Sequence, residues 1–170
     1  MEDSLTLKQV QLRLGVAQHV LIHLCEKGVV EPDVDDTLGR GNWRRFSQRN
    51  LFEFAIALEL RKYQIPVSIT GAVIKVLRSF ERSVREKQHL EFSFPVSFPD
   101  VLGGVNLYLY GGEYIVFSMG KGVKFGFNVT KLLDGNLKQV RVEKLTKLPT
   151  DYQSYLSLDL TALAQSISSP

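Results

Sequence analysis

The order of turn residues between Leu5 and Leu77 constrains this chain more than any other feature of its sequence. Gly15 and Gly28 each follow a segment whose apolar residues recur at helical spacing, and Pro32 comes shortly after the second glycine. A glycine just past the last periodic residue ends a helix, because glycine adopts the left-handed backbone conformation without steric cost. The pattern predicts two short helices joined by a tight turn.

Signals for helix starts flank this pair. Thr6 and Gln9 have the spacing of a capping box, which predicts that the first helix begins near Leu7. Ser47 is expected to cap a third helix, which ends before Pro66, and a fourth helix is expected from about residue 68 or 70 to about residue 89. The third helix is expected to keep these charged side chains in solvent: Arg49, Glu53, Arg61 and Lys62.

The second helix, expected from about Ala17 to Lys27, has one apolar face and one polar face. Its apolar face carries the residues expected to pack inward: Val20, Leu21, Leu24 and Cys25. Its outward face carries the candidate readers of a nucleic acid: Gln18, His19, Ile22 and His23. In a helix-turn-helix, the outward face of the second helix enters the major groove.

The segment from Pro32 to Phe46 is typical of a β-hairpin wing. Gly39 and Gly41 would supply the positive backbone angles of its tip, while Trp43 and Phe46 would pack down. Its three basic residues are the candidate phosphate contacts: Arg40, Arg44 and Arg45. Together with the two short helices, this segment predicts a winged helix-turn-helix.

The pieces from Leu5 to Leu77 resemble the DNA-binding domain of MerR-type (mercury-resistance-regulator-like) transcriptional regulators. Six pieces occur in the family's order: a short capped helix, Gly-Val opening the next helix, a Glu-x-Gly-hydrophobic-hydrophobic-x-Pro exit, a wing ending aromatic-Arg-x-aromatic, a Ser-capped helix, and a final helix after Ser68-Ile69. The resemblance covers a little under half of the chain. It implies a transcriptional regulator that binds double-stranded DNA, forms a dimer and senses an effector.

Carried over by position, the resemblance implies roles for individual residues. Gln18 and His19 would lie toward the major groove, and Arg44 would meet the DNA backbone, with Arg45 in the adjacent variable position. The chain departs from the family's Thr-Leu-Arg-Tyr-Tyr pattern, because Ile22 and His23 stand where the arginine and the first tyrosine usually stand. An isoleucine cannot hold a phosphate, which lowers both affinity and salt dependence.

The second half, residues 90–170, predicts a small, mainly antiparallel β module with short helices. One Gly-Gly pair and one Gly-Lys-Gly segment separate three strand-like segments, and a fourth is expected near the end: Val105–Tyr110, Glu113–Met119, Val123–Phe127 and Lys138–Leu145. The segment 125–132 also aligns with 156–163, and each copy is typical of a strand followed by a cap and a short helix. The chain is therefore expected to be α+β, with domains at residues 1–89 and 90–170.

Charge and composition narrow the function class. The net charge is +3, and residues 1–90 carry 14 Lys or Arg against 11 Asp or Glu, while residues 91–170 carry 7 against 7. All the excess positive charge is therefore N-terminal, where the resemblance places DNA. One cysteine, no leader-like N-terminus and no apolar run of about 20 residues together predict a cytoplasmic protein without a membrane span.

The sequence also contains residues that could suggest a metal site or a phosphate-binding loop, but ordinary structural roles explain them better. His19 and His23 have a spacing that two metal ligands can share, but no third ligand is suggested nearby, so no metal site is predicted. The glycines around Lys121 lack a following helix with Gly-Lys-Ser or Gly-Lys-Thr, so we interpret them as turn residues. We predict no enzyme and no cofactor. A second hypothesis, motivated by Ile22, is a protein-interaction adaptor that keeps the winged-helix shape without specific DNA binding.

Overall fold

The computed structural model describes residues 4–34, 44–88, 91–101, 103–120, 122–133 and 143–168. The helices are α1 (Leu7–Leu14), α2 (Gln18–Glu26), α3 (Gln48–Lys62), α4 (Val67–Gln88), α5 (Thr130–Leu133) and α6 (Leu160–Ser168). The strands are β1 (Leu5–Thr6), β2 (Arg45–Phe46), β3 (Val105–Tyr110), β4 (Tyr114–Met119), β5 (Val123–Asn128), β6 (Glu143–Lys144) and β7 (Tyr155–Asp159). The chain is α+β, as predicted. Across these residues, no helix is both long enough and apolar enough to cross a membrane.

Local signals place the helix ends where the sequence predicts them. The Thr6 hydroxyl accepts a hydrogen bond from the backbone of Gln9, and the Gln9 side chain accepts one from the backbone of Thr6, which completes the capping box of α1. Gly15 ends α1 with a φ of 61°. Ser47 caps α3 in the same manner, and α4 begins at Val67, slightly before the predicted start at residue 68 or 70.

A two-stranded sheet joins the start of the chain to the residues before α3. β1 and β2 are antiparallel, with Leu5 opposite Phe46 and Thr6 opposite Arg45. We predicted a hairpin within Pro32–Phe46, but the strand described in that range pairs with the N-terminal strand instead. Residues 35–43, which include Arg40 and Trp43, lie outside the described part of the chain.

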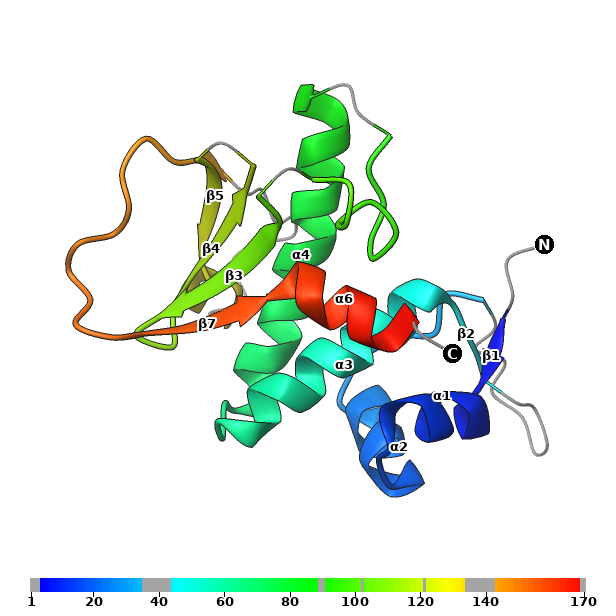
Figure 1. Ribbon diagram of the computed structural model, residues 1–170. Coiled ribbons are helices and arrows are strands. Elements are labelled where there is room, and N and C mark those ends of the chain that lie inside the picture. The colour runs from blue at the N-terminus through cyan, green and yellow to red at the C-terminus, as the bar shows by residue number, and fades with distance from the viewer. Residues whose placement is uncertain are drawn as a thin grey trace.

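The second half forms a five-stranded antiparallel sheet with the order β6-β5-β4-β3-β7 (Figure 1). The predicted glycine turns connect β3 to β4 and β4 to β5. The strand expected over Lys138–Leu145 is described only as β6, because residues 134–142 lie outside the described residues. β7 pairs with β3 at the edge opposite β6, so the segment before it crosses the width of the sheet.

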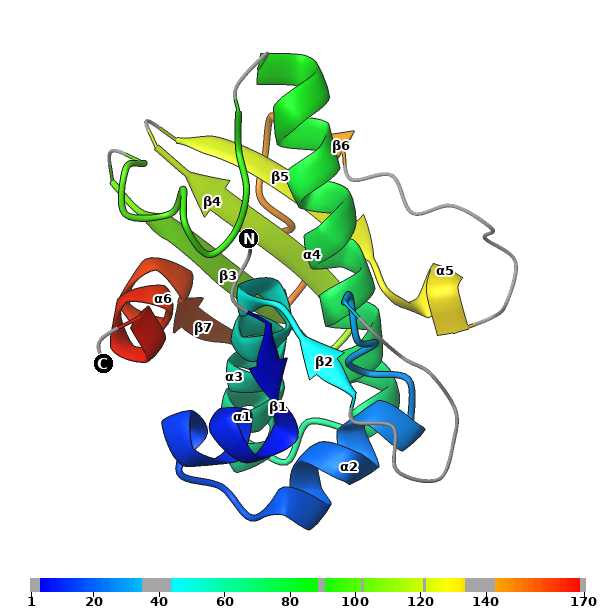
Figure 2. The same cartoon turned by 90° about the vertical axis from the view of Figure 1, so that its right-hand side faces the viewer.

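The main core lies between this sheet and α4, which crosses one face of the sheet (Figure 2). The ring of Phe80 on α4 stacks on that of Phe117 on β4, with 4.6 Å between centroids and 7° between planes. Phe125 on β5 meets the same ring edge-on at 5.5 Å. Residues from both halves of the chain join one hydrophobic cluster. The division at residue 89 stays a prediction, because a shared core does not show whether either half folds alone.

The last helix returns to the first half of the molecule. Asp159 at the end of β7 accepts a hydrogen bond from the backbone of Ala162, and Thr161 accepts one from the backbone of Val105 on β3. From this fixed start α6 packs on α3 (Figure 1). The strand-then-helix repeat predicted from the sequence is confirmed, since β5 leads into α5 and β7 leads into α6.

The opposite face of the sheet carries a cluster of tyrosines whose ring centroids lie 5.2–6.3 Å apart: Tyr108, Tyr110, Tyr114, Tyr152 and Tyr155. Burial raises the pKa of the phenols of Tyr110, Tyr114 and Tyr152. The segment before β7 packs on this face where Gly126 leaves room, since a Cβ there would lie 2.7 Å from the Leu145 side chain. The ring contacts of Tyr152 with Tyr110 and Tyr114 therefore help to hold this segment on the sheet.

Candidate nucleic-acid interface

The predicted readers lie at the exposed N-terminal end of α2. Gln18 and His19 are exposed, and His23, one turn further along, is half-buried. Leu21 and Leu24 on the opposite face are buried, which fixes the rotation of α2 about its axis. The described residues therefore bring three of the six predicted site residues onto one helix face.

A shallow depression of about 460 Å³ runs along this face of α2, lined by His19, Ile22, His23 and Glu26 together with Arg61 from α3. Ile22 is half-buried there. Within the described part of the chain, no group of three or more histidine, cysteine or acidic residues is arranged to hold a metal ion. The polar groups that line the depression are two imidazoles, the Glu26 carboxylate and the Arg61 guanidinium.

Arg44 and Arg45 lie at the base of the predicted wing, and both are half-buried. Arg45 belongs to β2, and its neighbour Phe46 is fully buried, with its ring 5.4 Å from that of Phe54 in an edge-on contact. This packing confirms the inward role predicted for Phe46. It also fixes the backbone from which both arginines project, while the sixth predicted site residue, Arg40, lies outside the described residues.

Three side chains join the chain before the predicted wing to the start of α3, and we call Asp33, Ser47 and Asn50 the clasp. The Ser47 hydroxyl donates to the Asp33 carboxylate at 2.9 Å and accepts from the backbone N–H of Asn50 at 3.1 Å. The Asn50 amide oxygen accepts from the backbone N–H of Asp33 at 2.8 Å. The clasp therefore holds the backbone at Asp33 against the N-terminus of α3.

An ion pair between α3 and α4 adjoins the clasp. Arg78 on α4 donates to both carboxylate oxygens of Glu53, at 2.6 Å from Nε and 2.8 Å from Nη2. The Asn50 amide nitrogen donates to Glu53 at 3.1 Å and to the backbone oxygen of Glu31 at 2.8 Å. Asn50 therefore belongs to both groups, so the clasp, α3 and α4 form one connected polar network.

The prediction that Glu53 faces solvent was wrong. Its side chain is fully buried, and burial raises the pKa of its carboxyl group above the ordinary value, with the Arg78 guanidinium opposing the rise. Helical spacing placed Glu53 on a polar stripe, but Arg78 on α4 covers that stripe. The Ser47-x-x-Asn50 spacing could have revealed the clasp, whereas no local signal pairs residues 25 positions apart.

A second ionic group lies further along α4. Glu81 is almost fully buried and accepts hydrogen bonds from Arg49 at 2.8 Å and from Arg85 at 3.1 Å. The Arg49 guanidinium also lies 5.5 Å from the ring centroid of Phe94, and Arg85 donates to the backbone oxygen of Phe92. This group ties the start of α3 to α4 and to the segment before the large sheet.

α2 therefore exposes one face, and Arg44 and Arg45 project from a backbone that is held by the clasp and the ion pairs of α3 and α4. The comparisons with known proteins give no match, either to a protein-family model or to a curated protein.

Proposed function

We propose that this protein is a DNA-binding transcriptional regulator whose N-terminal unit is a MerR-like winged helix-turn-helix. In this proposal α1, the turn at Gly15 and α2 are the helix-turn-helix, and Arg40, Arg44 and Arg45 belong to the wing. The clasp is the observation that carries the proposal. It joins Asp33 to the N-terminus of α3, directly after Arg44 and Arg45 and on the same scaffold that exposes α2.

In this proposal α2 enters the major groove with its N-terminal end toward the bases. The Gln18 amide can donate and accept along the edge of an adenine, and His19 can share a hydrogen bond with a neighbouring base. Both side chains are exposed, so neither has to leave a packed position to reach DNA. Arg40, Arg44 and Arg45 of the wing hold phosphates, which positions the helix without reading sequence.

The distribution of charge supports the same orientation. Residues 1–90 carry the whole excess of three positive charges, and the half that forms the large sheet carries none. Attraction to a phosphate backbone would then act on the unit that carries α2 and the wing. The sheet module remains free for self-association or for sensing an effector.

Fluorescence anisotropy with labelled duplexes tests the wing. Arg44→Ala should weaken binding to every duplex by a similar factor, because a phosphate contact carries no sequence information. The matched control is Lys147→Ala, which removes an exposed positive charge from the sheet module and should leave binding unchanged. Equal affinity of wild type and Arg44→Ala would remove the wing from the mechanism.

The same assay tests α2 with a selected and a scrambled duplex. Gln18→Ala should lower the preference for the selected duplex by about 1–3 kcal/mol, the range for one good base contact. Binding to the scrambled duplex should change little. A uniform loss on both duplexes would show that Gln18 contacts the backbone instead.

A second candidate function rests on Ile22. This half-buried apolar side chain sits between His19 and His23, where the resembling family usually carries an arginine. An apolar centre flanked by hydrogen-bonding groups suits a protein surface better than a phosphate. Folded protein that shows no duplex binding at low salt, and that co-purifies with a protein partner, would favour this adaptor.

We expect the regulator to be a cytoplasmic dimer. The buried face of α4 packs within its own chain, so the contact between copies should come from the sheet module rather than from a long helix pair. Sedimentation equilibrium should give twice the monomer mass of 19.2 kDa. A monomer at the concentrations at which DNA binds would contradict this expectation.

A further inference from the structure

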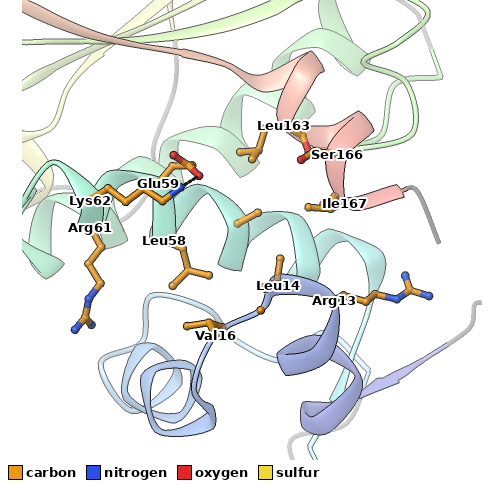
Figure 3. A pocket seen from close by; sticks show the side chains of 12 residues that line it. Arg13, Leu14, Val16, Leu58, Glu59, Arg61, Lys62, Leu163, Ser166 and Ile167 are labelled. Atoms are coloured by element: carbon orange, nitrogen blue, oxygen red, sulfur yellow. Dashed lines mark hydrogen bonds and ion pairs between the residues drawn. The ribbon is translucent and has the colours of Figure 1, made fainter.

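A cleft of about 520 Å³ opens where α6 meets the first helices (Figure 3), and we call it the α6 cleft. Three helices and the turn after α1 supply its apolar side chains: Leu14, Val16, Leu58, Leu163 and Ile167. In Figure 3 Leu163 and Ile167 point from α6 toward α3 and Leu14, while Leu58 points from α3 toward Val16. The volume lies within the range of about 300–1,000 Å³ that is typical of sites for small molecules.

The apolar walls of the α6 cleft are only partly covered by the protein itself. Leu14, Val16, Leu58 and Leu163 are each half-buried, although they belong to the edge of the hydrophobic cluster. Exposed apolar surface that is hollowed rather than flat can be covered by a molecule with an apolar body. Apolar surface of the cleft is therefore left uncovered by the protein and could be covered by a bound molecule.

The rim of the cleft is positively charged. Arg13 on α1 and Arg61 on α3 are exposed and lie at opposite ends of the cleft in Figure 3. With the residues that the structure describes, neither forms an ion pair. The acid among the lining residues, Glu59, is already paired with Lys62. The two guanidinium groups therefore favour an anionic group on the occupant.

We propose that the α6 cleft binds a small amphipathic anion, a molecule with an apolar body and one anionic group. The body lies between Leu58 on α3 and Leu163 on α6, and a guanidinium of the rim pairs with the anion. The occupant would contact α6, which follows the edge strand β7 of the large sheet. It would also contact Val16, which lies two residues before α2. Binding to the cleft is measured without DNA, so this inference stands apart from the proposed function.

Fluorescence titration of the full chain with two matched probes tests the proposal. The anionic probe is 8-anilinonaphthalene-1-sulfonate, and the uncharged probe is N-phenyl-1-naphthylamine, which shares its aromatic body. We expect saturable binding of both at one site, with the anion bound about tenfold more tightly. The double variant Arg13→Gln/Arg61→Gln should abolish that preference while it leaves the affinity for the uncharged probe unchanged.

Variants of the apolar wall locate the site. Leu163→Asn should weaken both probes at least tenfold, and Leu58→Asn, on a different helix, serves as a second variant if the first unfolds. The matched control is Leu148→Asn, which changes an exposed leucine of the sheet module and should leave both affinities unchanged. The proposal would be overturned if the wall variants bound the probes as well as the control does. It would also be overturned if wild type showed no saturable binding or no preference for the anionic probe.

Discussion

Replacing Arg78 with methionine tests the buried ion pair that joins α3 to α4. The change keeps most of the aliphatic volume and removes both charge-assisted hydrogen bonds, at 2.6 and 2.8 Å, to the Glu53 carboxylate, together with the 3.5 Å ion pair to Asp33. That carboxylate is fully buried, and the variant removes the guanidinium with which it is paired. Breaking a buried pair in this way costs about 3–5 kcal/mol of unfolding free energy.

The structure places the expected loss near the lower end of that range. The Arg78 side chain is 30% exposed, so water can reach part of the space that the guanidinium leaves. We therefore expect a loss of about 3 kcal/mol, and a fall in Tm of about 6–12 °C for a chain of this length. Urea denaturation followed by circular dichroism at 222 nm measures the free energy, and a thermal scan measures Tm.

Two further variants separate the ion pair from ordinary surface effects. Arg82→Met, one turn along the same helix, removes an exposed guanidinium and should change stability by less than about 0.5 kcal/mol. Glu53→Leu combined with Arg78→Met should recover more than half of the loss, because no buried charge remains. Equal stability of Arg78→Met and Arg82→Met, or a double variant as unstable as the single one, would refute the reasoning.

Three other outcomes follow from the geometry. Burial raises the folded-state pKa of Glu53, so its protonation stabilises the fold at low pH and this contribution is lost as pH rises from about 4.5; in urea titrations the stability of Glu53→Gln should therefore fall less than that of wild type between pH 4 and pH 7. Asn50→Ala opens the clasp and should weaken duplex binding in anisotropy measurements while α2 stays folded, and unchanged affinity would show that the clasp does not position the wing. Gly126→Ala would bring a Cβ to 2.7 Å from Leu145 and to 3.0 Å from Tyr114, so it should lower stability by about 1–3 kcal/mol in urea denaturation; an unchanged midpoint would show that the segment before β7 is loosely held.

The features that the sequence predicts correctly are local ones. Thr6 and Ser47 cap helices because the partner of each cap lies three residues away, and Gly15 ends α1 through its own backbone angle. The strands around Gly111-Gly112 are correct for the same reason, since a short turn fixes which residues pair. In each case the interaction and its signal occupy the same few residues.

The features that the sequence does not reveal depend on partners far apart in the chain. β2 pairs with β1 across about 40 residues, and β7 joins the sheet beside β3 rather than beside β6. The burial of Glu53 depends on Arg78, and helical spacing alone cannot distinguish a polar side chain in solvent from one under another helix. For the candidate interface, periodicity finds the exposed face of α2 and the Ser47-x-x-Asn50 spacing indicates part of the clasp, but only the fold reveals that Asp33 completes it.

The salt dependence of duplex binding tests the central proposal most directly. If Arg40, Arg44 and Arg45 each neutralise one phosphate, log K should fall with log salt at a slope of about −2.7 per bound chain. Affinity should then drop about 40-fold between 50 and 200 mM salt. Binding to duplex DNA with this slope would support the regulator, and the absence of duplex binding by folded protein at 50 mM salt would contradict it.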